Sequence, residues 1–134
     1  MNAYAQARNR YQDDGMKMTS PQRLVVLLYQ RLMRDLHDAD AAIEDRRIED
    51  AHNALIHAQD IVLEFHLALD AEGFEGGERL ADIYVYLTDR LVDANRAKDR
   101  AIIAECRSLV EPLAEAFETV AQAPAASNLT TTPA

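Results

Sequence analysis

The stretch from residue 48 to residue 69, IEDAHNALIHAQDIVLEFHLAL, decides the fold of this chain. Its apolar side chains recur at alternating steps of three and four residues, along Ile48, Ala51, Leu55, Ala58, Val62, Phe65 and Leu69. This heptad spacing keeps one face of an α-helix against neighbouring helices, in a helix roughly 33 Å long. The segment is therefore expected to be a packed helix of a bundle.

A second apolar row runs beside the first in the same segment, along Ile56, Leu63 and Leu67. Two rows exceed what one neighbouring helix can cover. Two interpretations stay open at this point. Both rows are core if the helix touches two neighbours, or the surplus row forms a groove with Tyr84 and Leu87 for an amphipathic helix of a partner.

Three further helices are expected, over residues 21–45, 78–97 and 100–122. Ser20 can cap the first of them, and Pro21 fits its first position, where a backbone N–H would be unpaired. Asp99 is the expected N-cap of the last helix. The residues expected to face the core are Leu24, Leu28, Leu32, Leu36, Ala39 and Ile43, then Leu80, Tyr84, Leu87, Leu91 and Ala94, and finally Ile102, Cys106, Leu109, Leu113, Phe117 and Val120.

The chain thus divides into an N-terminal arm over residues 1–19, a bundle over residues 20–122 and a disordered tail over residues 123–134. Short links between successive helices predict an all-α, antiparallel up-and-down four-helix bundle. Pro112 lies inside the last helix, where it removes a backbone hydrogen bond. We expect a kink near residues 108–112.

Composition narrows the classes of function. The chain has 134 residues and a net charge of −9, with no basic patch interleaved with aromatics, so neither nucleic-acid binding nor adsorption to an anionic membrane is expected. A single cysteine, Cys106, cannot form an internal disulfide, and no apolar run reaches the length of a membrane span. The expected location is the cytoplasm.

Few residues offer catalytic or metal chemistry. Glu49 and His52 form a Glu-x-x-His motif, but di-iron bundles need that motif on two helices and it occurs once. Cys106 falls in an apolar row, where a free cysteine behaves as a small hydrophobe. We expect no enzyme activity, no catalytic residue, no cofactor and no metal. A metal-binding bundle built on Glu49 and His52, and a dimeric structural or signalling bundle, stay open as alternatives.

An ordered set of short motifs resembles the flagellar secretion chaperones (FliS). The motifs are Asn2-Ala3-Tyr4, Tyr11-Gln12, Ser20-Pro21 followed by an apolar run to Tyr29, Ala58-Gln59-Asp60-Ile61, Gly76-Gly77, Leu80-Ala81-Asp82-Ile83-Tyr84, and Arg90-Leu91-Val92-Asp93-Ala94-Asn95. No single motif is specific, but their order and spacing over residues 2–117 are.

The resemblance implies a cytoplasmic export chaperone that binds the disordered C-terminal segment of flagellin, prevents its premature polymerisation and keeps it competent for type III export. In this family the segment becomes helical and wraps around the bundle. The resemblance implies groove positions at Ile56, Ile61, Ile83, Tyr84, Leu87, Leu91 and Asn95, with Tyr4 and Tyr11 on an arm that can cover the groove. It leaves an export-gate component, a co-chaperone and a homodimer open as further partners.

Overall fold

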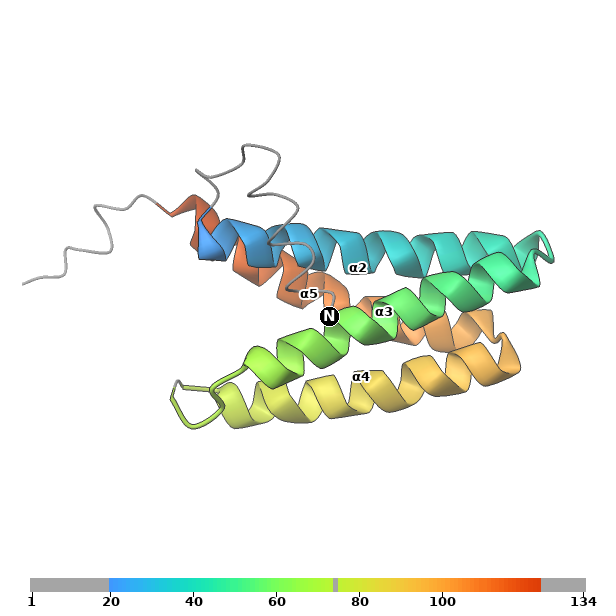
Figure 1. Cartoon of the computed structure of the whole chain (residues 1–134). Helices are drawn as coiled ribbons and strands as arrows, with labels where there is room; N and C mark the ends of the chain where they lie inside the picture. Colours follow the sequence, from blue (N-terminus) through green and yellow to red (C-terminus); the bar gives the residue numbers. More distant parts are fainter. Residues whose placement is uncertain (1–19, 74, 124–134) are drawn as a thin grey trace, which may run out of the picture.

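The computed structural model describes residues 20–73 and 75–123. Four helices make up this part of the chain, α2 (Pro21–Glu44), α3 (Ile48–Ala68), α4 (Gly77–Ala97) and α5 (Arg100–Gln122). Successive helices run antiparallel, and α5 packs beside α2 to close the bundle (Figure 1). The all-α four-helix bundle is confirmed. The arm with Tyr4 and Tyr11, and the tail beyond Ala123, lie outside the described residues.

The expected caps form the helix starts. The Ser20 side chain accepts a hydrogen bond from the Arg23 backbone N–H at 3.1 Å, which satisfies one of the amides that a helix leaves unpaired at its first turn. Asp99 does the same for α5 by accepting from the Ala101 N–H at 2.8 Å. These local signals explain why the helix boundaries agree with the expected ones to within one residue.

Two helices end on left-handed residues that are not glycine. Arg46 has φ of 60°, and the N–H of the next residue, Arg47, returns to the Ala42 carbonyl at 2.7 Å. Lys98 has φ of 51° at the end of α4. This backbone closure is normally made by glycine. Because no glycine stands at Arg46, the turn between α2 and α3 has no sequence signal.

The core contains the first apolar row of α3 and excludes the second. Ala51, Leu55, Ala58, Val62 and Phe65 are buried, whereas Ile48, at the first residue of the helix, is exposed. The second row, Ile56, Leu63 and Leu67, is also exposed. The interpretation that both rows are core is therefore wrong.

Helix α5 differs from its expected packing. Its buried residues are Ile103, Cys106 and Val110, whereas Ile102, Leu109, Leu113 and Phe117 are only partly buried and Val120 is exposed. The core-facing row is thus rotated by about one residue from the expected row, because α5 packs between α2 and α4. The helix continues through the exposed Pro112. The kink stays a prediction.

An aromatic cluster fills one region of the core. The Tyr29 ring stacks on Phe65 at 4.3 Å and on Phe117 at 5.1 Å between ring centroids. The hydroxyls of Tyr29 and Tyr84 are 2.6 Å apart, which joins α2 to the diagonally opposite α4. Burial raises the pKa of both tyrosines above the usual range, so the pair is neutral. Each hydroxyl is the other's partner inside the core.

We expect that Tyr29→Phe or Tyr84→Phe alone lowers the free energy of unfolding by about 1–3 kcal/mol, because the remaining hydroxyl is left buried without a partner. The double Phe variant should lose less than the sum of the two single losses. Urea denaturation of the four proteins measures this coupling. Strictly additive losses would show that the hydroxyls do not act as a pair.

Candidate functional site

The seven expected groove residues do not form one surface. Four of them, Ile61, Tyr84, Leu87 and Leu91, are buried in the core. Three of these belong to the apolar row of α4 that faces the bundle interior. Ile83 and Asn95 are partly buried and Ile56 is exposed, and of these three Ile56 and Asn95 line one pocket. The surface open to a partner is therefore different from the expected groove.

The surface that the bundle leaves open lies along α3 and α4. Its exposed fractions are 40% for Ile56, 47% for Leu63, 69% for Leu67, 48% for Val85 and 41% for Val92. Residues seven apart lie on the same side of a helix, so Ile56 and Leu63 share one side of α3, and Val85 and Val92 share one side of α4. Ile56 and Val92 line one pocket between the two helices. We call these five residues the α3/α4 apolar surface.

A pocket of about 410 Å³ lies at one end of this surface, where α3 begins and α4 ends. Its lining comprises His52, Ile56, Gln59, Val92, Asn95, Arg96 and Lys98. The Lys98 ammonium donates to both the backbone oxygen and the Oδ1 of Asn95, each at 2.7 Å. The Asn95 amide then donates to His52 Nδ1 at 3.0 Å. A neutral His52 accepting at Nδ1 carries its proton on Nε2.

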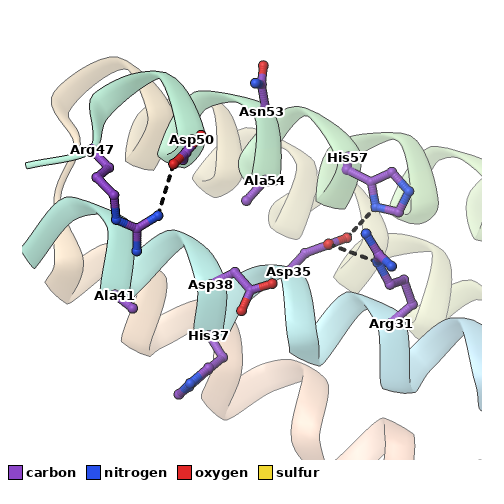
Figure 2. A pocket seen from close by; sticks show the side chains of 10 residues that line it. All are labelled: Arg31, Asp35, His37, Asp38, Ala41, Arg47, Asp50, Asn53, Ala54 and His57. Atoms are coloured by element: carbon purple, nitrogen blue, oxygen red, sulfur yellow. Dashed lines mark hydrogen bonds and ion pairs between the residues drawn. The ribbon is translucent and has the colours of Figure 1, made fainter. Parts of the chain in front are cut away.

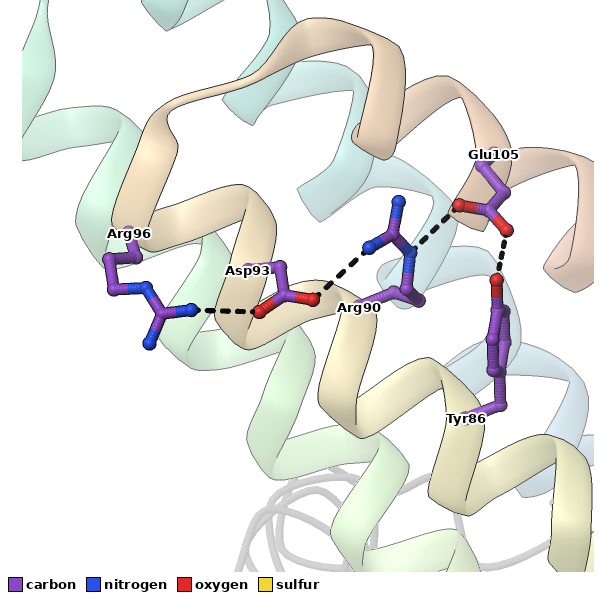
Figure 3. Close-up of polar contacts among 5 residues, drawn as sticks. All are labelled: Tyr86, Arg90, Asp93, Arg96 and Glu105. Atoms are coloured by element: carbon purple, nitrogen blue, oxygen red, sulfur yellow. Dashed lines mark hydrogen bonds and ion pairs between the residues drawn. The ribbon is translucent and has the colours of Figure 1, made fainter.

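A second polar network joins α4 to α5 (Figure 3). Arg90 donates to Glu105 at 2.9 Å and to Asp93 at 3.1 Å, and Arg96 reaches Asp93 at 3.2 Å. The Tyr86 hydroxyl also donates to Glu105. Hydrogen bonds from Tyr86 and Arg90 hold the pKa of Glu105 below its usual range. Tyr86 and Arg90 of α4 thus hold Glu105 of α5, which gives these three residues a structural role.

A polar cleft of about 450 Å³ lies between α2 and α3 (Figure 2). Asp35, buried on α2, contacts His57 Nδ1 of α3 at 2.5 Å and Arg31 Nε at 3.1 Å. At the other end of the cleft Arg47 pairs with Asp50 at 2.9 Å. The cleft has no nucleophile, and both of its arginines are already paired with carboxylates. It fixes how α2 and α3 pack.

Asp35 makes the stability of this contact depend on pH. Burial raises its pKa above the usual aspartate range, although His57 and Arg31 act in the opposite direction. The folded protein thus holds a proton on Asp35 more tightly than the unfolded chain does. This contribution to stability is complete below about pH 4, the usual aspartate pKa, and is lost as the pH rises through the raised pKa.

We therefore expect the free energy of unfolding of the native protein to increase, relative to that of Asp35→Asn, between about pH 7 and about pH 4.5. Asn cannot titrate, so the difference isolates Asp35 and its neighbours His57 and Arg31. Chemical denaturation of both proteins at several pH values measures it. A difference that shrinks toward acid would mean that the ion pairs, and not burial, dominate Asp35.

Of the residues with metal or nucleophile potential, His52 is hydrogen-bonded and Cys106 is buried. His52 bonds to Asn95, and Glu49 is exposed one turn away. Within residues 20–73 and 75–123, no three His, Cys, Asp or Glu side chains converge as a metal site would require. Burial raises the pKa of the Cys106 thiol to about 12, so Cys106 is a small core hydrophobe, as expected.

Comparison with known proteins identifies the family. The model of the family described as flagellar protein FliS matches residues 3–124. The chain belongs to the FliS family. It is also 29% identical, over 112 residues, to the flagellar secretion chaperone FliS of Bacillus subtilis (strain 168), an alignment that covers 84% of each chain.

FliS membership supports a chaperone role in building the flagellum and implies a flagellar substrate as partner. It makes the chain a member of a chaperone family and not of a known class of enzymes. No helix of the described residues is long and apolar enough to cross a membrane. The helical bundle and the secretion-chaperone family expected from the sequence are thus confirmed.

Sequence reasoning missed several residues of the α3/α4 apolar surface and its polar pocket. Val85 and Val92 carried a signal, since their spacing of seven places both on one side of a helix. Arg96 and Lys98 carried no such signal in the sequence, because the pocket that they line is completed by His52 from another helix. Leu63 and Leu67 were recognised as part of a second row that could form a groove, but the partners expected for that row, Tyr84 and Leu87, are buried.

Proposed function

We propose that this FliS chain binds the C-terminal segment of flagellin on the α3/α4 apolar surface, in the cytoplasm, and keeps it unpolymerised until export. The five side chains of this surface, each at least 40% exposed, carry the proposal. Exposed apolar residues gathered on neighbouring helices of a bundle mark an interaction site. An amphipathic helix can cover two parallel rows of this kind with its own apolar face.

The chemistry suits a disordered client. A segment that folds on binding pays ordering entropy at that moment, so its binding is reversible although it covers a long surface. Helices α3 and α4 have 21 residues each, so they present similar lengths of surface. The side chains that pack the bundle core are different from the five on the α3/α4 apolar surface. The client should therefore gain helix while the bundle changes little, which circular dichroism of the mixture measures.

Substitution of exposed residues tests the site directly. Ile56→Asp and Val92→Asp should each weaken binding of the flagellin C-terminal peptide at least about tenfold, because a carboxylate would replace an apolar contact. Both side chains are exposed, so thermal melts should stay close to those of the native protein. Val120→Asp is the control, since Val120 is also an exposed apolar residue, at 62%, but lies on α5. It should bind normally.

Two results would contradict the proposal. One is normal peptide binding by both Asp variants. The other is a native dimer, seen by light scattering, that both variants convert to monomers without a change in peptide binding. That result would make the α3/α4 apolar surface a contact between two copies of the chain.

Leu87→Asp separates core from surface. Leu87 is fully buried in α4, so an unpaired carboxylate there should unfold the protein or lower its stability by more than about 4 kcal/mol. Loss of peptide binding by this variant would then follow from loss of the fold. A folded Leu87→Asp protein with a normal melting temperature would show that this residue is not core.

A further inference from the structure

The two ends of the α3/α4 apolar surface differ in charge. Near the end where α3 meets α4 through the loop, Glu78 and Asp82 are exposed, and the described loop residues add Asp70, Glu72 and Glu75. Within the described residues, none of these five carboxylates forms an ion pair. Arg79 is the basic residue of that stretch. This end of the surface is acidic.

The opposite end is the polar pocket. Among its seven lining residues are two cations, Arg96 and Lys98, and no carboxylate. Arg96 pairs with Asp93 at 3.2 Å but is 77% exposed, so its guanidinium can take a second partner. The contrast with the cleft between α2 and α3 is clear, since that cleft is lined by three aspartates. In a chain of net charge −9, a pocket with this lining favours an anion.

The hydrogen bonds in the pocket prepare it for a carboxylate. Lys98 uses two of its N–H groups on Asn95, which leaves a third. His52, accepting at Nδ1 from Asn95, keeps a donor at Nε2. Three side chains on two helices, Lys98, Arg96 and His52, thus offer donors at one place, and charged donors of this kind form the stronger hydrogen bonds to carboxylates.

We propose that this pocket holds the carboxyl end of the bound segment, with its terminal carboxylate against Lys98 and Arg96. The inference rests on the proposed function, and adds the direction in which the segment lies. The bound helix runs parallel to α4 and antiparallel to α3. Its amino-terminal end, where the helix dipole is positive, then lies at the acidic end near Glu78 and Asp82.

A pair of peptides tests the assignment. The probe is the C-terminal segment of the flagellin encoded by the same genome, made once with a free terminal carboxylate and once as the terminal amide. We expect the native protein to bind the amide about five- to tenfold more weakly, which matches one lost charge-assisted contact. Amidation otherwise favours helix, so a purely helical effect would act in the opposite direction.

Variants locate the effect. Lys98→Gln and Arg96→Gln together should remove the difference between the two peptides, and Lys98→Arg should retain most of it. Arg23→Gln and Arg34→Gln together are the matched control, because this variant also removes two positive charges, but exposed ones on α2. It should bind both peptides as the native protein does. Thermal melts of all variants confirm that each is folded.

Each outcome has a distinct meaning. Equal binding of acid and amide by the native protein overturns the inference and leaves the proposed function intact. A difference that persists in the Lys98→Gln, Arg96→Gln protein also overturns it, since the carboxylate then lies elsewhere. Equal binding of both peptides that these two substitutions weaken alike would assign the pocket to an acidic side chain instead. Binding of neither peptide contradicts the proposed function itself.

Discussion

Helix α3 carries two rows of large apolar side chains, and the bundle has room for only one. The row through Leu55, Val62 and Phe65 packs inward, because it continues the apolar faces of α2 and α4. The row through Ile56, Leu63 and Leu67 then has to face outward, beside Val85 and Val92 of α4. Exposing so much apolar area is unfavourable in water. Exposed apolar surface of this kind commonly marks an interaction site, and the proposed function gives it a use.

Polar contacts tie together each pair of neighbouring helices. They are His57–Asp35 between α3 and α2, Asn95–His52 between α4 and α3, Arg90–Glu105 between α4 and α5, and Arg100–Asp40 between α5 and α2. The Arg100 guanidinium lowers the pKa of the Asp40 carboxyl. Ion pairs whose partners are partly exposed, such as Arg90–Glu105 and Arg100–Asp40, contribute little stability. The larger effect of these four contacts is on the register between neighbouring helices. The Tyr29–Tyr84 hydrogen bond does the same for α2 and α4, which lie diagonally opposite each other.

The register of α4 along α3 decides which side chains meet on the α3/α4 apolar surface. The contact between Asn95 and His52 sets how far α4 slides along α3, and so brings Ile56 and Val92 to the same pocket.

The net charge of the chain affects its self-association. At −9 the chain repels copies of itself, which opposes self-association through an open apolar surface. An export chaperone needs both a surface that accepts a client and a body that stays dispersed.

The sequence alone determined the four helices and their limits, because capping and apolar periodicity are local properties. Ser20, Pro21 and Asp99 act on amides within three residues of themselves. The family too could be recognised from ordered motifs. The tertiary structure decided which row of α3 is core, which groove residues implied by the resemblance are buried, and that Lys98 lies across from His52. Those features depend on neighbours distant in the chain, because burial and charge pairing are properties of the packed bundle and not of any one helix.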